Sequence, residues 1–304
     1  MGKWIPSTEY INNKKEELKK EVKELKEKYG RAPSLSVVLI GNNKASQSYV
    51  KRKEKFAKEI GMNAETLKFE SISEKNLLKL IDKLNKRDDV DGFIIQLPLP
   101  KEININKIIE AISPEKDVDG FHPYNLGKLF RGEDTLFPCT PFGIVNFLKF
   151  YKFELMGKNA VIVGRSNIVG KPLSILLLKE NMTITITHSK TKNLPGITSQ
   201  ADFLFAAAGR PLMITKDYVK EGAIVIDVGV NALDDEKIVR KELSSLPEKI
   251  KSFEKRGYVL VGDVHPEVVN KASYLTPVPK GIGPITVLTL IENTIKAFKK
   301  SLKA

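Results

Sequence analysis

The stretch Asn159–Ser189, NAVIVGRSNIVGKPLSILLLKENMTITITHS, decides the fold. Its two β-branched runs, Ala160–Val163 and Thr183–Thr187, have the length and composition of buried strands. The leucines between the runs recur at helical spacing, and glycines flank the turn that follows the first run. The order strand, turn, helix, strand predicts a βαβ unit and therefore a parallel sheet.

The turn Gly164–Gly170 (GRSNIVG) is similar to a phosphate-binding loop. It is one residue longer than the dinucleotide fingerprint GxGxxG and has Ser166 at the second glycine position. A strand leads into Gly164 and a helix starts at Gly170, so N–H groups of the helix start could face a pyrophosphate. The alternative is an ordinary tight turn between a strand and a helix. We favour the dinucleotide site.

The residues after the second strand indicate which dinucleotide binds. A site for NAD usually has Asp or Glu there, which accepts a hydrogen bond from the ribose 2′-hydroxyl. Here the strand is followed by His188, Ser189 and Lys190, with no acid. Arg165, Ser189 and Lys190 instead offer donors and positive charge for a 2′-phosphate. We therefore predict NADP.

Composition indicates a protein with substantial hydrophobic cores. The 304 residues, 41% of them hydrophobic, suffice for two domains. No apolar run reaches the roughly 18 residues that span a bilayer, and we recognise no signal-peptide core. We therefore expect a cytoplasmic protein without membrane association. Cys139, the single cysteine, has no partner for an internal disulfide.

The formal charge of +13 raises the question of an anionic partner. The lysines lie largely on helical stretches interleaved with glutamate, such as 13–28 and 51–59, which is typical of solvated helix faces. None of the common nucleic-acid-binding signatures is present, so we expect small-molecule ligands and no nucleic acid. The three histidines lack ligand spacing, and no metal site is predicted.

A helix predicted from about Ala45 to Ile60 carries Tyr49 and Lys53 on one face, because the two are four residues apart. An aromatic ring beside an ammonium could hold a flat substrate against a proton-transfer group. The alternative is that Lys53, one of several lysines on this helix, is simply solvated.

Gln96 ends a buried strand in DGFIIQLPLP (Asp91–Pro100), because the following prolines cannot pair in a central strand. Polar groups at the carboxyl ends of parallel strands face the ligand crevice of an open α/β sheet. Gln96 is thus a site candidate, the alternative being an amide that caps a loop. The loop PEKDVDGFHP (114–123) carries two aspartates among few apolar residues, and functional residues concentrate on such loops.

The second half of the chain contains further predicted elements. Asp202–Ala207, Ala223–Val228 and Val259–Val261 are predicted strands of the parallel sheet, and Asp234–Gly257 is a charged helical insertion. Thr140 is the predicted N-cap of the helix that links the two domains. A proline–glycine loop precedes a closing helix, Val287–Lys300, which we expect to pack on the first domain.

Seven motifs, in order along the chain, together resemble the bifunctional methylenetetrahydrofolate dehydrogenase/cyclohydrolase family. They are SYVKRK (48–53), DGFIIQLPLP (91–100), PEKDVDGFHPYNLGKL (114–129), PCTPFG (138–143), GRSNIVGKP (164–172), HSKT (188–191) and the TPVP…GPIT loop (276–286). The resemblance implies two α/β domains flanking a cleft, the second a Rossmann-type NADP-binding domain with a parallel sheet. We expect a folate-binding, catalytic domain at 1–140, completed by 284–304, and the NADP-binding domain at 141–283. The resemblance further implies a homodimer.

The resemblance also implies roles for single residues. Lys53 would be the acid/base residue and Gln96 its hydrogen-bond partner. Tyr49 would stack on the folate, and Asp119 would hold the pterin. Further substrate contacts would come from Leu97, Pro98, Pro277 and Gly281, and cofactor contacts from Gly164, Arg165, Ser166 and Ser189.

The implied activity is oxidation of 5,10-methylenetetrahydrofolate to 5,10-methenyltetrahydrofolate with NADP⁺, then hydrolysis to 10-formyltetrahydrofolate, in one-carbon metabolism. Three alternatives are a dehydrogenase without the cyclohydrolase, another NADP dehydrogenase of the shikimate type, and a basic nucleic-acid-binding module. The chain departs from the family pattern at Lys280, where a glycine is usual. A left-handed conformation there would cost about 1–2 kcal/mol.

Overall fold

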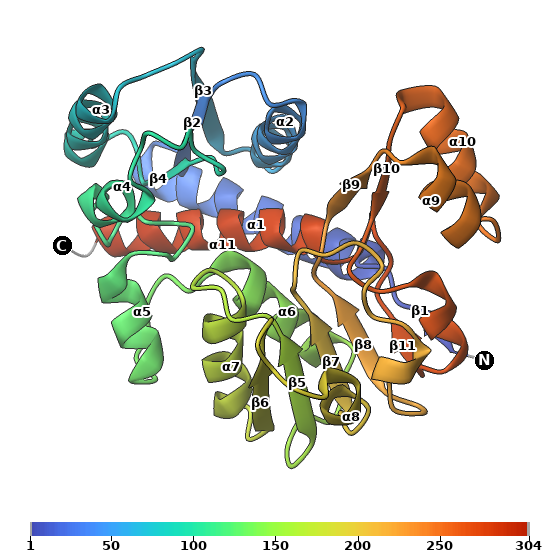
Figure 1. The fold of residues 1–304 in the computed structure, drawn as a ribbon. Coiled ribbons are helices and arrows are strands. Elements are labelled where there is room, and N and C mark those ends of the chain that lie inside the picture. Colours follow the sequence, from blue (N-terminus) through green and yellow to red (C-terminus); the bar gives the residue numbers. More distant parts are fainter. Residues whose placement is uncertain (1, 303–304) are drawn as a thin grey trace. The chain divides into compact units, whose positions relative to one another are not determined.

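The computed structural model describes residues 2–302, apart from the side chains of Lys44 and Ala45, and divides into two compact units (Figure 1). The first unit comprises Tyr10–Phe142 and Thr286–Ala304. The second unit comprises Met1–Glu9 and Gly143–Ile285. Both units are α/β, as the sequence predicts.

The first unit contains a three-stranded parallel sheet in the order β3-β2-β4. The central strand is buried along its whole length. Helix α3 packs on this sheet through Leu77, Ile81 and Leu84, which recur every three or four residues and are almost completely buried. The elements of this unit are β2 (Ser34–Ile40), α2 (Lys44–Glu59), β3 (Asn63–Phe69), α3 (Glu74–Lys86), β4 (Gly92–Ile95), α4 (Ile105–Ala111) and α5 (Pro123–Phe130), with most of α1 (Thr8–Tyr29) and α11 (Ile282–Ser301).

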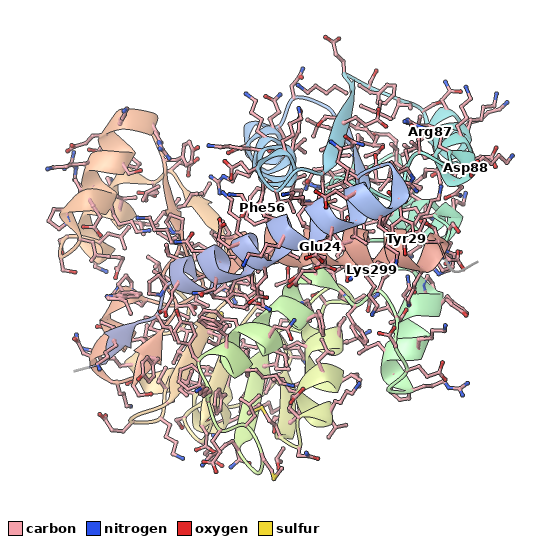
Figure 2. The ribbon with its side chains drawn as sticks, turned by 180° about the vertical axis from the view of Figure 1, so that it is seen from behind. Glu24, Tyr29, Phe56, Arg87, Asp88 and Lys299 are labelled. Atoms are coloured by element: carbon pink, nitrogen blue, oxygen red, sulfur yellow. The ribbon has the colours of Figure 1, made fainter. Side chains whose placement is uncertain are left out.

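Helices α1 and α11 lie side by side in the first unit (Figure 2). Lys299 of α11 forms an ion pair with Glu21 of α1. The ring of Tyr29 meets that of Phe298 edge-on, with 6.0 Å between centroids. The closing helix thus packs on the first unit, as predicted. Within residues 2–302, no helix combines the length and apolarity needed to cross a membrane.

The second unit contains a six-stranded parallel sheet in the order β1-β11-β8-β7-β5-β6 (Figure 1). The predicted βαβ unit is present, because β5 and β6 pair in parallel and α7 connects them. The elements of this unit are β1 (Lys3–Trp4), β5 (Asn159–Val163), α7 (Gly170–Lys179), β6 (Thr183–Thr187), α8 (Leu194–Thr198), β7 (Phe203–Ala206), η1 (Lys216–Tyr218), β8 (Ile224–Asp227), β9 (Asn231–Leu233), α9 (Glu236–Glu242), α10 (Pro247–Arg256), β10 (Val259–Val261), η2 (Pro266–Asn270) and β11 (Tyr274–Leu275).

The N-terminus departs from the expected division of the chain. Strand β1 extends the sheet of the second unit by pairing with β11, so the first nine residues belong to that unit. The backbone N–H of Ile5 continues the ladder by donating to Leu275 O at 2.9 Å. The sequence placed these residues in the first domain, because a two-residue strand leaves no periodic signal.

Two further expectations were wrong. Strand β10 does not join the parallel sheet, since it pairs antiparallel with β9 in a separate ribbon. Helix α6 (Cys139–Phe150) begins before Thr140, which is therefore not its N-cap. Instead, the Thr140 hydroxyl lies 2.8 Å from that of Thr286 on α11.

The charged insertion is helical, as predicted, and forms a small layer of its own. Helices α9 and α10 stand beside the β9–β10 ribbon (Figure 1). Their shared core consists of Leu233, Val239, Leu243, Val259 and Val261. The insertion is therefore an ordered part of the second unit.

Candidate active site

A buried lysine and a glutamine meet in the first unit. Lys53 of α2 is only 7% exposed, whereas Lys51 and Lys55 on the same helix are exposed. Its Nζ donates to Gln96 Oε1 at 3.0 Å. Lys53 is therefore not a solvated surface lysine.

Gln96 is held at both ends in an orientation that suits this contact. Its backbone N–H continues the sheet by donating to Val38 O at 2.9 Å, directly after β4. Its side-chain Nε2 donates to Leu97 O at 2.8 Å, so Oε1 faces the lysine. The amide thus orients Lys53 instead of capping a loop alone.

Tyr49 lies one helical turn before Lys53 and is half-buried. The guanidinium of Arg52 lies 5.5 Å from the centroid of its ring. Burial raises the pKa of the Tyr49 phenol, and the charge of Arg52 opposes this shift. The ring is accordingly neutral at physiological pH and partly accessible, as a stacking surface must be.

The two aspartates of the KDVDG loop have different environments. Asp117 is buried and accepts hydrogen bonds from the His122 N–H at 2.8 Å and from Asn125 Nδ2 at 2.9 Å. It therefore holds the loop together. By contrast, no group in the described part of the chain donates a hydrogen bond to the Asp119 carboxylate, which leaves it free to accept from a ligand.

The charge state of Asp119 depends on its surroundings. Burial raises the pKa of its carboxyl to about 6. The charge of Lys53 opposes the shift and that of Asp117 reinforces it. At neutral pH the site therefore presents a carboxylate, close enough to Lys53 for the two charges to interact.

Sequence reasoning missed Asn293, which fixes the loop that bears Asp119. From α11, its Nδ2 donates to Val118 O and Phe137 O, both at 2.8 Å. The only available signal was a lone asparagine within an apolar helix face, and such a residue is usually hydrogen-bonded when buried. Nothing in the local sequence identifies its partners, which are more than 150 residues away.

Cys139 has a structural environment. Its side chain is 1% exposed, and its Sγ–H donates to Val118 O at 3.2 Å. Burial raises the pKa of the thiol well above its ordinary value. A thiol in this state is a poor nucleophile. Among residues 2–302, no group of three or more His, Cys, Asp or Glu side chains is arranged to hold a metal ion.

In the second unit, the candidate cofactor residues lie at one edge of the parallel sheet. Val163 of β5 pairs with Thr187 of β6, so the segments carrying Arg165 and Ser189 leave the sheet side by side. Both side chains are exposed. Gly164 has φ +135°, and a Cβ there would lie 2.2 Å from Ala207 O, so only glycine fits.

Ser166 has a local function that the sequence did not reveal. Its Oγ accepts hydrogen bonds from the backbone N–H groups of Val169 at 3.1 Å and Gly170 at 3.4 Å. The hydroxyl thus caps the start of α7, where we expected the N–H groups to face a pyrophosphate. A Cβ on Gly170 would lie 2.1 Å from Gly164 O, which explains the glycine.

The turn after β6 presents its polar side chains outward. The His188 N–H donates to Thr191 Oγ1 at 2.9 Å, and His188 Nδ1 accepts from the Lys190 N–H at 3.1 Å. Ser189 and Lys190 are exposed on this turn. Residues 188–193, which follow β6, include no Asp or Glu, so the residues present fit a 2′-phosphate better than a free 2′-hydroxyl.

The remaining candidates lie on loops. Leu97 is half-buried and Pro98 exposed, directly after Gln96. Pro277 and Gly281 belong to the second unit, where a Cβ on Gly281 would lie 2.4 Å from Pro277 O. Between them, Lys280 has φ +81°, so the left-handed conformation considered for it is present.

Comparison with known proteins places these features in one family. Residues 5–119 match the model of the tetrahydrofolate dehydrogenase/cyclohydrolase catalytic domain, and residues 138–302 match that of the NAD(P)-binding domain. The bifunctional protein FolD of Oceanobacillus iheyensis is 50% identical over 301 residues, covering 98% of both chains. That of Bacillus anthracis is 48% identical over 299 residues, covering 98% of this chain and 96% of its own.

Two solved structures extend the comparison. Bifunctional FolD from Campylobacter jejuni has a TM-score of 0.88 at 42% identity, covering 99% of this chain and 100% of its own. FolD from Trypanosoma brucei, complexed with NADP and an inhibitor, has a TM-score of 0.89 at 34% identity, covering 100% of this chain and 99% of its own.

Proposed function

The chain belongs to the tetrahydrofolate dehydrogenase/cyclohydrolase family, and from this premise we propose how its residues perform the family's two reactions. The protein oxidises 5,10-methylenetetrahydrofolate to 5,10-methenyltetrahydrofolate with NADP⁺. It then hydrolyses the product to 10-formyltetrahydrofolate, in one-carbon metabolism. The observation that carries the assignment of roles is the buried hydrogen bond between Lys53 and Gln96. The free Asp119 carboxylate interacts electrostatically with the same Lys53.

The first unit would bind the folate. A carboxylate only accepts hydrogen bonds, which suits the ring N–H and amino groups of a pterin, and Asp119 has no competing donor in the described part of the chain. Tyr49 would stack on the flat ring. The guanidinium of Arg52, which lies over the ring of Tyr49, would help to keep that ring in place. Leu97 and Pro98 would complete this surface after the strand that ends at Gln96.

The second unit would bind the cofactor. NADP, when bound, supplies the hydride acceptor for the methylene carbon. Arg165 and Ser189 would bind its 2′-phosphate, because both are exposed at the carboxyl edge of the sheet. Gly164 lets the backbone approach closely at that edge, and Ser166 keeps a hydroxyl proton to donate. Oxidation needs positioning more than proton transfer, so these residues bind and orient.

Hydrolysis requires proton transfers, and Lys53 is the group we assign to them. Water adds to the methenyl carbon, a C–O bond forms, and Lys53 Nζ takes a proton from the water. The C–N bond to the ring nitrogen then breaks and Nζ returns a proton to that nitrogen, while the new hydroxyl loses its remaining proton to solvent as the C=O bond of the formyl group forms. A neutral amine keeps two N–H groups, so the bond to Gln96 can persist through both steps and hold Nζ in place.

A spectrophotometric assay of the purified protein tests the function. We expect 5,10-methylenetetrahydrofolate to drive reduction of NADP⁺ far better than of NAD⁺, and added methenyltetrahydrofolate to decay faster than in buffer. Reduction without accelerated decay would leave a dehydrogenase alone. Absence of reduction with either cofactor would overturn the assignment.

We also propose a homodimer, a cytoplasmic location and no nucleic-acid partner. The surface lysines support the last point, because many form i,i+4 ion pairs, such as Lys58 with Glu54 and Lys86 with Asp82. Sedimentation at several concentrations tests the dimer. Retention on immobilised DNA or RNA that falls steeply with salt would contradict the absence of nucleic-acid binding.

A further inference from the structure

The loop Thr276–Gly281, which we call the substrate loop, needs support from outside itself. Two of its residues, Pro277 and Pro279, have no backbone N–H to donate. Lys280 has φ +81°, a conformation that residues other than glycine rarely adopt. Thr276 anchors the start of the loop, since its N–H donates to Val225 O and its hydroxyl accepts from the Asp227 N–H; beyond it, the carbonyl groups are available to hold the loop.

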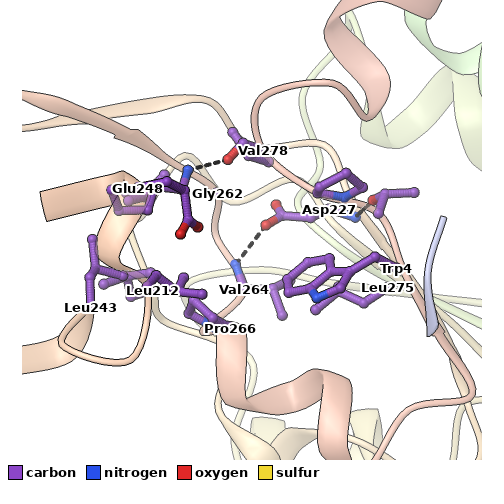
Figure 3. Close-up of a pocket in the computed structure, with 15 residues that line it drawn as sticks. Trp4, Leu212, Asp227, Leu243, Glu248, Gly262, Val264, Pro266, Leu275 and Val278 are labelled. Atoms are coloured by element: carbon purple, nitrogen blue, oxygen red, sulfur yellow. Dashed lines mark hydrogen bonds between the residues drawn. The ribbon is translucent and has the colours of Figure 1, made fainter. Parts of the chain in front are cut away.

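Two of these carbonyl groups bind donors from distant segments. Lys280 O accepts from both the backbone N–H and the hydroxyl of Ser7, at 2.9 and 3.0 Å. Val278 O accepts from Nζ of Lys249, as the dashed line at Val278 marks in Figure 3. The carbonyls on both sides of Pro279 are thus held.

Lys249 lies on α10, in the helical insertion. It is half-buried, and its Nζ also donates to Leu260 O on β10 at 2.6 Å. No acid of the described residues lies within ion-pair distance of this ammonium. Desolvation lowers its pKa, against the opposing charges of Glu248 and Asp227. The ammonium of Lys249 therefore forms two charge-assisted hydrogen bonds, both to backbone carbonyl groups.

Among the described residues, the bond from Lys249 Nζ to Val278 O is the hydrogen bond that joins the insertion to the substrate loop. A cavity of about 250 Å³ is lined by residues of both, among them Glu248 of α10 and Val278 of the loop (Figure 3). Trp4 of β1 also lines it. Because this space is not filled by packed side chains, the hydrogen bond of the Lys249 ammonium crosses it to reach the loop.

We propose that Lys249 is a positioning residue for the folate, which holds the substrate loop in the conformation that Lys280 disfavours. The inference rests on the proposed function and on the folate contacts that the family resemblance implies for Pro277 and Gly281. In this proposal the insertion affects folate binding only through the substrate loop, without itself touching substrate or cofactor.

Kinetics of Lys249→Met tests the proposal, because methionine keeps the length of the side chain and removes the donor. Lys251→Met, an exposed lysine two residues further along α10, is the matched control. We expect the KM for 5,10-methylenetetrahydrofolate to rise about tenfold in Lys249→Met, the effect of one charge-assisted hydrogen bond. The Kd for NADP⁺, whose proposed site lies elsewhere in the same unit, should not change. Lys251→Met should match the wild type in both.

A second substitution distinguishes positioning of the substrate loop from a general loss of structure in the second unit. Lys280→Gly removes the disfavoured left-handed lysine, so the loop needs less support. We expect the KM effect of Lys249→Met to be smaller when Lys280→Gly is also present. A purely structural role for Lys249 would give the same effect in both backgrounds, together with a weaker Kd for NADP⁺, and would overturn the proposal.

Hydrogen exchange keeps the test independent of activity. The amides of Lys280, Gly281 and the residues that follow should exchange faster in Lys249→Met than in wild type or Lys251→Met. If the wild type proves inactive, the proposed function fails, while faster exchange still supports the positioning of the loop. Unchanged KM and unchanged exchange in Lys249→Met would refute the proposal.

Discussion

Asp119→Asn should make the free protein more stable while it weakens folate binding. The ordinary pKa of an aspartate is 3.8, and burial raises that of Asp119 to about 6. At about 1.36 kcal/mol per pKa unit, the ionised carboxyl destabilises the folded state by about 3 kcal/mol. Because the side chain is partly exposed, we expect a gain on the order of 1–3 kcal/mol for the neutral amide at neutral pH.

The sign of the pH dependence follows from the raised pKa. Above pH 6 the carboxyl is ionised in folded and unfolded chains, so its destabilising effect is fully present. As the pH falls from 6 toward 4, the folded state takes up the proton first and the effect disappears. The stability difference between Asp119→Asn and the wild type should therefore be constant above pH 6 and shrink below it.

Binding should change in the opposite direction. The loss of a charged acceptor for the pterin N–H groups should raise the KM for 5,10-methylenetetrahydrofolate about 10- to 100-fold. Steady-state kinetics and thermal unfolding between pH 4 and 8 measure both effects. Glu115→Gln, on the exposed part of the same loop, is the control and should leave the KM unchanged. A less stable Asp119→Asn protein, or one with wild-type KM, would refute the reasoning.

Three further substitutions test other contacts. Tyr49→Ala should raise the KM for the folate about three- to tenfold, because a stacking ring is lost, and leave the Kd for NADP⁺ unchanged. Arg165→Ala should raise the KM for NADP⁺ about 10- to 100-fold but not that for NAD⁺, which lacks the 2′-phosphate; equal effects on both would contradict its role. Asp91→Asn should lower the free energy of unfolding by about 3 kcal/mol in chemical denaturation. The reason is that the nearly buried carboxylate accepts two hydrogen bonds from Arg31, both at 2.8 Å. An unchanged denaturation midpoint would contradict this.

Most of the fold could be predicted from the sequence, because its strands are strongly patterned. The run Thr183–Thr187 coincides with β6, and the run Ala160–Val163 matches β5 except for its first residue. The elements that escaped prediction are short or depend on distant partners. Strands β1 and β11 have two residues each and form only against each other and the existing sheet.

The candidate site was predictable where its residues stand in local motifs. The spacing of Tyr49 and Lys53 follows from the helix, and Gln96 from the end of its strand. The residues that hold the site could not be found in this way. Asn293 and Lys249 bind backbone carbonyl groups, which have no sequence signature, and their partners are set by tertiary packing.

The two activities of Lys53→Met, measured on one preparation, test the central claim most directly. Lys53 is assigned to proton transfer in hydrolysis, so methenyltetrahydrofolate hydrolysis should fall at least about 100-fold, toward the rate in buffer. Hydride transfer from 5,10-methylenetetrahydrofolate to NADP⁺ should persist, because that step needs no proton from Lys53. A Lys53→Met protein that hydrolyses methenyltetrahydrofolate at the wild-type rate would contradict the account.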